Sequence, residues 1–356
     1  MIKDNKSKTY VVGILGATGM IGQKVVELMK QVFSEEIEII KASSSLNNKE
    51  YMKIDINNAC DLIRFVEQCD VVINCVGTSL LNSKKLINVI VKLEKDYIDP
   101  FGWGVEANIK SKVNSRIVLN SGNNPGLLGI LVDYMCTPDT KDISIFGGGN
   151  ETPSVGAIAD IILSSIRGYG KIDAYIKDYK ESISNNKGVT LWDDKNICSS
   201  KMLPYKYLYL SDEILKISRR NNIENVKQFR IITNIEEKNL MARACIECIK
   251  IPQRIEDKKY LNGLLESFKR FSGDTPLWYF IKIKCGTVDS VETLVLRIDD
   301  SLLLTCTTIL NMLYVLLNKR VDSGIYWPFE IYDKNNLFNT LNLVNAKISI
   351  EEEALI

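Results

Sequence analysis

Residues 11–26 read VVGILGATGMIGQKVV, and this stretch decides the fold of the N-terminal half. An apolar run typical of a buried strand leads into a turn with glycine at 16, 19 and 22, and a helical pattern follows. Gly16 permits the tight turn, Gly19 lets backbone approach a phosphate, and Gly22 lets the helix lie close on the strand. Because backbone N–H groups at a helix start attract anions, the pattern predicts a site for a dinucleotide's pyrophosphate. The alternative, that these glycines serve only the turn and its packing, stays open.

The first 135 residues continue this alternation of strand and helix, which is typical of a parallel sheet with crossover helices. Strands are expected at 9–15, 37–42, 70–76, 97–99 and 116–119, and helices at 19–33, 58–68, 83–93, 105–113 and 126–135. The sequence therefore predicts an α/β fold whose N-terminal half is a Rossmann doubly wound parallel sheet.

The length of 356 residues predicts two domains. Pro138 and Asp139 mark a connection, so we expect an NAD(P)-binding Rossmann domain over 1–135 and a mixed α/β domain for substrate binding and dimerisation over 136–300. Strand candidates in the second domain lie at 143–146, 229–235, 279–285 and 293–298, and helices at 155–167 and 257–271. An apolar helix at 301–317 opens a C-terminal segment, about 301–356, that we expect to pack back on the first domain.

The composition argues against several classes of protein. With 45 Lys+Arg against 44 Asp+Glu, the formal net charge of +1 offers no basic excess for nucleic acid. The longest apolar run, 302–317, is shorter than the ~20 residues that a bilayer span needs, so no membrane partner is expected. No apolar signal region is visible at the N-terminus, and the nine cysteines stand mostly singly in apolar runs. These features predict a cytoplasmic protein with reduced thiols and a small-molecule substrate.

The chain contains no histidine. This excludes Ser-His-Asp and Cys-His catalysis and the usual zinc sites, and we expect no metal site. A proton must move through Tyr, Lys, Asp, Glu, Cys or water. Tyr97 and Asp99 alternate on an expected strand and so point the same way, which makes them the catalytic candidates, with Glu151 as a second one. A packing role for Tyr97 is the alternative.

The second expected strand ends in Lys41-Ala42-Ser43-Ser44-Ser45, without the carboxylate that NAD-preferring sites place there for the ribose 2′-OH. Hydroxyl groups and Lys41 suit a 2′-phosphate, so NADP(H) is favoured over NAD(H). The alternative is that Lys41 is only a solvated surface charge. Asp55 lies either near the adenine or at a helix N-cap. The expected cofactor-binding residues are Gly16, Thr18, Gly19, Met20, Ile21, Gly22, Ser43, Ser44, Asp55, Cys75, Val76, Gly77 and Thr78.

Further short motifs follow the glycine turn in order. They are residues 70–77 (DVVINCVG), 97–100 (YIDP), 120–127 (NSGNNPGL), 147–149 (GGG) and 324–328 (GIYWP). Together they resemble the saccharopine dehydrogenase (saccharopine reductase-like) family of NAD(P)-dependent oxidoreductases. The resemblance is good over 9–150 and 279–328 and poor over 170–275.

The resemblance implies a Rossmann domain, a mixed α/β substrate domain, a cleft between them, and hydride transfer from NAD(P)H to a C=N bond. It implies that Tyr97 lies near the substrate and that residues 120–126 close over the nicotinamide and the substrate. The expected substrate residues are Trp103, Asn123, Asn124, Pro125, Gly126 and Glu151. Homodimers are common for this architecture, so a homodimer is expected.

Two departures argue against saccharopine itself as the substrate. Asn124 replaces an acidic residue of the lysine-pathway members, and Phe146 replaces a cysteine. A less charged C=N compound, derived from an amino acid or a specialised pathway, fits better. The alternatives are a C=C (enoyl-type) reductase and a non-catalytic NADP-binding regulatory or scaffold protein. A short-chain dehydrogenase is excluded because no Tyr-x-x-x-Lys occurs, and a semialdehyde dehydrogenase shares the turn but needs a Cys-His pair.

Overall fold

The computed structural model describes residues 9–33, 36–46, 49–109, 112–185, 188–192, 204–273 and 275–354. The chain divides into two compact units, each built from two segments. Unit 1 contains residues 1–127 and 302–344, and unit 2 contains residues 128–301 and 345–356. These limits differ from the expected domains 1–135 and 136–300, because residues 128–135 belong to unit 2 and the C-terminal segment is shared between the units.

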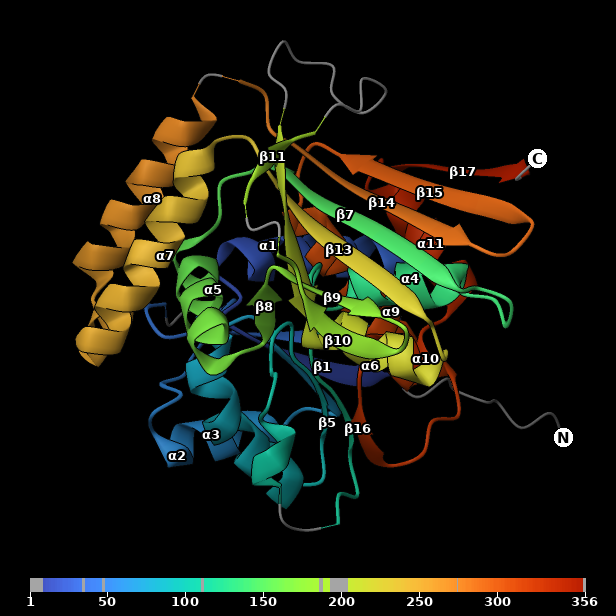
Figure 1. The fold of residues 1–356 in the computed structure, drawn as a ribbon. Coiled ribbons are helices and arrows are strands. Elements are labelled where there is room, and N and C mark those ends of the chain that lie inside the picture. The colour runs from blue at the N-terminus through green and yellow to red at the C-terminus, as the bar shows by residue number, and fades with distance from the viewer. Residues whose placement is uncertain are drawn as a thin grey trace, which may run out of the picture. The chain divides into compact units, whose positions relative to one another are not determined.

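Unit 1 is built on a parallel sheet with the strand order β16-β6-β5-β4-β1-β2-β3. Figure 1 labels β1, β5 and β16 of this sheet. Its strands are β1 (Tyr10–Leu15), β2 (Ile37–Ser43), β3 (Met52–Lys53), β4 (Val71–Asn74), β5 (Asp96–Ile98), β6 (Arg116–Val118) and β16 (Gly324–Tyr326). Its helices are α1 (Met20–Val32), α2 (Ala59–Glu67), α3 (Ser79–Lys92), α9 (Leu302–Asn318), α10 (Pro328–Ile331) and α11 (Lys334–Leu343). The order reverses between β1 and β4, which is the switch point of a doubly wound sheet. The predicted Rossmann fold is confirmed.

The strands of this sheet are apolar because both faces are covered. β4 is buried along its whole length, and Val12, Ile14 and Leu15 of β1 are at most 1% exposed. Close packing extends to Gly13, where a Cβ would overlap the Cys69 sulfur. The helix expected at 105–113 is wrong, because in the described part of this segment, 105–109 and 112–113, the chain forms one 3₁₀ turn, Glu106–Asn108, and no α-helix.

Helix α9 is the apolar helix expected near 301–317. It is buried on most of its surface and packs against α1 and α11 within unit 1. Three of its polar side chains have partners: Thr307 and Thr308 donate to carbonyls four residues earlier, and Asn311 donates to Asp333 O, just before α11, at 2.8 Å. In the described part of the chain, no helix combines the length and the apolar character of a membrane span.

Unit 2 contains a mixed sheet whose main path runs β10-β9-β13-β7-β14-β15-β17. Its strands are β7 (Asp142–Asn150), β8 (Gly170–Ile172), β9 (Ala174–Lys177), β10 (Lys180–Ile183), β11 (Thr190–Leu191), β12 (Tyr205–Ser211), β13 (Asn225–Ile232), β14 (Trp278–Gly286), β15 (Ser290–Ile298) and β17 (Lys347–Ala354). Its helices are α5 (Val155–Arg167), α6 (Asp212–Arg220), α7 (Ile235–Lys250) and α8 (Lys258–Ser272), and α4 (Leu127–Met135) spans the boundary between the units.

The structure corrects two expectations about unit 2. The segment expected as a strand at 229–235 ends as a strand at Ile232, and α7 follows it directly. A capping box starts α7, because the Asn234 side chain and the Glu237 side chain each satisfy a backbone N–H of the first turn. At the C-terminus, β17 pairs with β15 of unit 2 instead of joining unit 1.

The two faces of this sheet carry different chemistry. On one face, Phe146 stacks on Phe229 with ring centroids 5.0 Å apart and on Trp192 at 5.7 Å. Phe146 therefore belongs to an aromatic cluster, which Phe280 extends. Because alternate residues of a strand point to opposite faces, Arg230 lies on the other face from Phe229.

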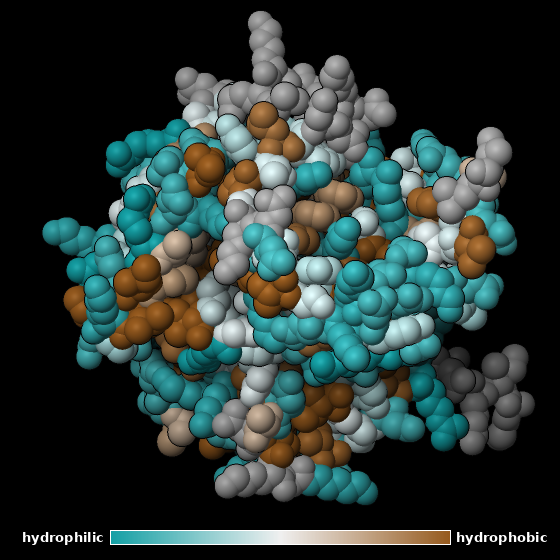
Figure 2. Space-filling view, viewed as in Figure 1, coloured by the Kyte–Doolittle hydropathy of each residue, from teal (hydrophilic) through white to brown (hydrophobic). Residues whose placement is uncertain are grey.

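Helices α5, α7 and α8 of unit 2 lie side by side (Figure 1). Ile246 and Ile249 of α7 are 53% and 61% exposed, and Ile251 follows the helix at 45%. Figure 2 shows apolar surface on the side where α7 and α8 lie in Figure 1. We call these three residues the isoleucine patch.

Candidate functional site

The glycine turn joins β1 to α1 at the carboxyl end of the sheet. Gly16 has φ +74°, and a Cβ there would lie 2.7 Å from the carbonyl oxygen of Cys75. A Cβ at Gly22 would overlap Gly16 O, so this glycine lets α1 lie against the turn. Gly19, in contrast, has an ordinary extended backbone, and a Cβ there would lie 3.3 Å from Gly16 O. Two of the three glycines are therefore needed by the fold, and Gly19 is free for another role.

Helix α1 begins without a side-chain cap among the residues that the structure describes, and its N-cap residue is Gly19. The first turn of a helix has backbone N–H groups without partners inside the helix. At Met20, Ile21 and Gly22 these groups carry the positive end of the helix dipole. These N–H donors and the side-chain-free glycines beside them form a cradle that suits a pyrophosphate, and binding there stays a prediction.

The serines after β2 shape a turn beside the glycine turn. Ser43 Oγ lies 3.3 Å from Thr18 Oγ1, and it accepts hydrogen bonds from the backbone N–H groups of Ser45 and Leu46. Ala17 N donates to Ala42 O at 3.0 Å, which ties the two turns together. Ser43 is buried, whereas Ser44 is exposed. Of the two serines predicted to bind the cofactor, only Ser44 is therefore exposed to solvent.

Lys41, the residue expected to favour a 2′-phosphate, forms an ion pair with Glu50. Its ammonium also lies 4.7 Å from the centre of the Tyr51 ring. The Lys41 side chain is 11% exposed and that of Glu50 is 63% exposed. The hydrogen bond from Lys41 lowers the pKa of Glu50, so the carboxylate is charged at neutral pH. Sequence reasoning missed Glu50, because it follows β2 by several residues and reaches Lys41 only through the fold.

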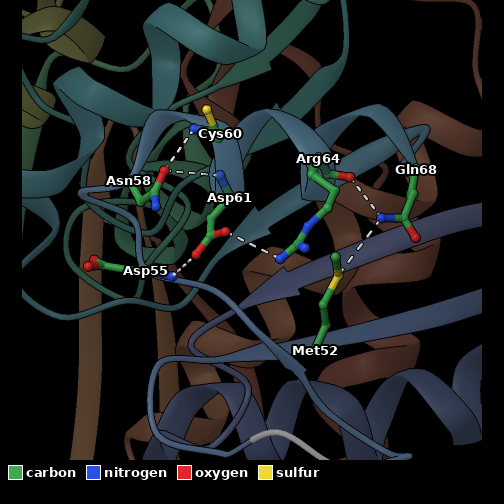
Figure 3. Close-up of polar contacts among 7 residues, drawn as sticks. All are labelled: Met52, Asp55, Asn58, Cys60, Asp61, Arg64 and Gln68. Carbon is green, nitrogen blue, oxygen red and sulfur yellow. Dashed lines mark hydrogen bonds and ion pairs between the residues drawn. The ribbon is translucent and has the colours of Figure 1, made fainter.

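Asp55 is exposed and precedes α2 (Figure 3). Asn58, not Asp55, caps this helix, because Asn58 Oδ1 accepts from the N–H groups of Cys60 and Asp61 (Figure 3). Asp55 Oδ1 accepts from the Asn57 N–H at 2.9 Å. The expected N-cap role of Asp55 is therefore wrong, and its place near the adenine stays a prediction.

Residues 75–78 follow β4 next to the glycine turn. Cys75 N donates to Leu15 O at 2.8 Å, and Val76 N donates to Asn74 Oδ1 at 3.0 Å. Gly77 O accepts from the Asn82 side chain, and Thr78 is the N-cap residue of α3. Burial raises the pKa of the Cys75 thiol well above its ordinary value, so this thiol stays neutral. These contacts hold the segment against the glycine turn.

A buried carboxylate lies at the end of β5. Asp99 Oδ2 accepts from Tyr97 OH and Ser83 Oγ at 2.6 Å each, and from Asn74 Nδ2 at 3.0 Å. Asp99 Oδ1 accepts from the Phe101 N–H. Tyr97 and Asp99 thus point the same way, as the strand alternation predicts, but both are 0% exposed. Burial raises the pKa of both groups. This network links β4, β5 and α3, and the catalytic role of the pair stays a prediction.

We expect Asp99→Asn to destabilise the protein by about 2–4 kcal/mol. An asparagine keeps one acceptor oxygen, while its amide group faces buried donors that now lack a partner. Tyr97→Phe removes only one donor and should cost about 1 kcal/mol. Urea unfolding followed by circular dichroism measures both values. Equal losses in the two variants would show that the carboxylate does not organise this network.

The loop that follows β6 contains buried polar atoms without partners in the described structure. They are both side-chain heteroatoms of Asn120, Ser121 Oγ and Asn123 Oδ1. Asn120 and Ser121 are 0% exposed, and Asn120 has φ +64°. Buried polar groups are nearly always satisfied, so such a group of orphans is typical of a site that takes a ligand or water. Both residues lie in the segment 120–126 that the resemblance places over the nicotinamide and the substrate.

The remaining predicted residues of this region lie around the same loop. Asn124 is exposed, Pro125 and Gly126 are buried, and Leu127 N donates to Gly122 O at 2.9 Å. Trp103 is half-buried in unit 1. All predicted cofactor residues and these substrate residues belong to unit 1, whereas Glu151 belongs to unit 2.

Glu151 lies beside a guanidinium that sequence reasoning missed. Ser301 Oγ donates to Glu151 Oε2 at 2.7 Å. Burial raises the pKa of Glu151, against the opposing effects of the Ser301 hydrogen bond and the Arg230 charge. A carboxyl group with a raised pKa is suited to hold a proton near neutral pH.

Arg230 stands on β13 opposite Tyr207 of β12. Burial disfavours its charge, but Tyr207, Glu151, Tyr209 and Tyr279 outweigh burial and raise the pKa of Arg230 above its ordinary range. The residue therefore keeps its positive charge on a half-buried sheet face rich in tyrosine hydroxyls. The signal in the sequence is a lone charge inside the apolar run Phe229-Arg230-Ile231-Ile232. Glu151, Tyr207, Tyr209 and Tyr279 thus lie near the Arg230 charge.

The described residues contain no group of three His, Cys, Asp or Glu side chains arranged to hold a metal ion. Every cysteine in the described ranges is a free thiol.

Comparison with known proteins agrees with this geometry. Residues 11–99 match the family described as semialdehyde dehydrogenase, NAD binding domain. No curated protein matches the chain. Among solved structures, the fold is similar to apo saccharopine dehydrogenase (L-Glu forming) from Saccharomyces cerevisiae, with a TM-score of 0.64 at 12% identity over 98% of this chain and 100% of that chain.

Two other solved structures are more distant. A mutant meso-dapdh from Clostridium tetani has a TM-score of 0.49 at 15% identity, covering 92% of this chain and 96% of that chain. Aspartate semialdehyde dehydrogenase II from Vibrio cholerae has a TM-score of 0.32 at 10% identity, covering 79% and 75%. Both likenesses are weaker than the one to saccharopine dehydrogenase. The chain therefore has the fold of saccharopine dehydrogenase, and its residues 11–99 are similar to an NAD-binding domain.

Proposed function

We propose that this protein is an NAD(P)H-dependent reductase that acts on a C=N bond of an amino-acid-derived or specialised metabolite. The observation that carries the proposal is the uncapped start of α1 behind a glycine turn in which only Gly19 is dispensable for the fold. The similarity of residues 11–99 to an NAD-binding domain and the fold of saccharopine dehydrogenase support it. Semialdehyde dehydrogenase chemistry does not fit, because the chain contains no histidine to pair with a cysteine.

We assign a separate chemical role to each group of residues. When bound, the cofactor supplies a hydride. The α1 cradle holds the pyrophosphate, and the orphaned polar atoms of Asn120 and Ser121 offer donors and an acceptor to the nicotinamide end. Arg230 binds a carboxylate of the substrate, since a guanidinium matches that group with paired hydrogen bonds. Glu151 Oε2 delivers a proton to the substrate nitrogen.

The choice between NADPH and NADH depends on the pair formed by Lys41 and Glu50. We favour NADPH, with Lys41 binding the 2′-phosphate once Glu50 releases it. Glu50→Gln is then expected to raise NADPH affinity about 3- to 10-fold, because a competing carboxylate is removed, and to leave NADH affinity unchanged. Fluorescence titration with both nucleotides measures this ratio. Weaker NADH binding with unchanged NADPH binding would instead make Glu50 the acceptor for a ribose 2′-OH, and the preference would be for NADH.

The proposal is tested by binding and turnover together. Titration with NADPH and NADH should show micromolar to submillimolar binding, and a panel of imines should oxidise the reduced cofactor. Turnover with enoyl compounds alone would favour the C=C reductase. Tight binding without turnover across both panels would favour a regulatory or scaffold protein. Absence of binding would remove all three.

We propose further that the protein forms a homodimer through unit 2. The support is the isoleucine patch, because exposed branched aliphatic residues grouped on one helix are typical of interfaces. Changing Ile246 and Ile249 together to Glu should convert a dimer to a monomer in size-exclusion chromatography with light scattering. Lys258→Glu, on the neighbouring helix α8, is the matched control for added negative charge. A monomeric wild-type protein would refute the dimer.

A further inference from the structure

Two cysteines of unit 2 come together although they are far apart in the sequence. Cys136 directly follows α4, and Cys285 lies near the end of β14. Their thiols are hydrogen-bonded to each other. Cys136 is half-buried, and Cys285 is 3% exposed. The pair therefore has one thiol that reagents can approach and one that only its neighbour can reach.

The backbone around the pair is held firmly. Lys141 N donates to Gly286 O at 2.9 Å, next to Cys285, and β7 then pairs with β14 with Ile143 opposite Cys285. Between Cys136 and this contact, Thr137 N donates to Thr140 Oγ1 at 2.9 Å, and Thr140 N donates to Thr137 O at 3.1 Å. The Thr137–Thr140 turn thus returns the chain from Cys136 to the end of β14, and the closeness of the thiols is part of the fold.

We infer that Cys136 and Cys285 are a thiol pair that a small-molecule disulfide, such as oxidised glutathione, converts into an intramolecular disulfide. The inference does not depend on the proposed reductase function.

The exchange proceeds in two balanced steps. The Cys136 thiolate attacks one sulfur of oxidised glutathione, which forms a mixed disulfide and releases one glutathione thiolate. The Cys285 thiolate then attacks Cys136 Sγ, which forms the Cys136–Cys285 bond and releases the second glutathione. Two protein thiols are oxidised, one glutathione disulfide is reduced to two glutathiones, and the two thiol protons end on them.

The hydrogen bond assigns the order of the two steps. Cys285 donates its S–H to Cys136, and this contact is the largest cause that raises the pKa of Cys285, ahead of burial. Cys285 therefore keeps its proton while the two thiols are in contact, and Cys136, the more exposed of the two, reacts with the reagent first. Once Cys136 carries a glutathionyl group, its sulfur no longer raises the pKa of Cys285, and Cys285 attacks it. Glu292 lies opposite Cys285 on β15, and its charge raises the pKa of Cys285 both before and after Cys136 is modified.

The test uses the full-length protein with oxidised glutathione under native conditions, followed by non-reducing peptide mapping and intact mass. The exposed thiol of Cys60 reports that the reagent is active. In the wild type, most of the protein should acquire the Cys136–Cys285 linkage, which dithiothreitol reverses. In Cys285→Ser and Cys285→Ala, the reaction should stop with one glutathionyl group on Cys136. In Cys136→Ser, Cys285 should stay unmodified.

Two results would overturn the inference. One is a wild-type protein that accumulates the mixed disulfide on Cys136 without going on to the linkage. The other is an unmodified Cys136 while Cys60 is fully glutathionylated. Both are read on the wild type, so they hold even where a variant does not fold.

Discussion

A Gly19→Val variant is expected to lose at least about 100-fold in affinity for NADPH and NADH, which corresponds to about 2.7 kcal/mol. The Gly19 backbone, at φ −75° and ψ 166°, is one that valine adopts readily, so the turn should still form. The branched side chain would stand over the first N–H groups of α1, where the pyrophosphate is expected to bind. The dissociation constants come from fluorescence titration, and circular dichroism with thermal melting reports the fold.

Two companion variants separate cofactor loss from unfolding. Gly22→Val should unfold or strongly destabilise unit 1, because its Cβ alone would overlap the Gly16 carbonyl oxygen. Gly263→Val in α8 has open space around its Cβ and should leave both stability and cofactor affinity near wild type. Wild-type cofactor affinity in a folded Gly19→Val protein would end the assignment of the cradle.

For Glu151→Gln, we expect turnover to fall by about 100-fold or more while cofactor affinity is retained. The amide keeps the size and the contact with Ser301 but has no proton to give. In the wild type, the acid must be protonated to act, so kcat should decrease as pH rises through the raised pKa of Glu151. The variant should lack this decrease, because the group that titrates is gone. Steady-state kinetics at several pH values measure both effects.

The control for this variant is Glu266→Gln, which changes an exposed carboxylate of α8 that forms an ion pair with Lys269. It should leave kcat and its pH profile unchanged. A Glu151→Gln enzyme with wild-type kcat and the wild-type pH profile would show that the proton comes from another group. Water would then be the first candidate, since no histidine is present.

Much of unit 1 is predictable because its signals are local. The glycine turn, the buried strands and the helices between them are encoded in runs of a few residues, and parallel βα units follow one handedness. The roles of Gly16 and Gly22 follow from the same run, and the structure gives Gly16 its positive φ and Gly22 its close packing, whereas the phosphate role of Gly19 stays a prediction. The resemblance to saccharopine dehydrogenases is confirmed for the fold.

The features that escaped prediction depend on long-range pairing. Arg230 meets Tyr207 because β12 pairs with β13, and it lies near Glu151 because β7 pairs with β13. No short pattern specifies these registers. Glu50 reaches Lys41 through a turn of the chain after β2. Helix α7 is a different case, since Asn234 and Glu237 form a capping box that is visible in the sequence itself and that marks the end of the strand before residue 235.

The path of the chain through the two units has a consequence for how the protein is made. Unit 1 needs β16 and helices α9 and α11 from residues 302–344, so its parallel sheet stays unfinished until this segment has left the ribosome. Strands β1–β6 are made first, but β16, which pairs with β6, is made only after residues 128–301 of unit 2. Shortened genes that stop before residue 344 should therefore yield aggregates instead of a minimal nucleotide-binding fragment.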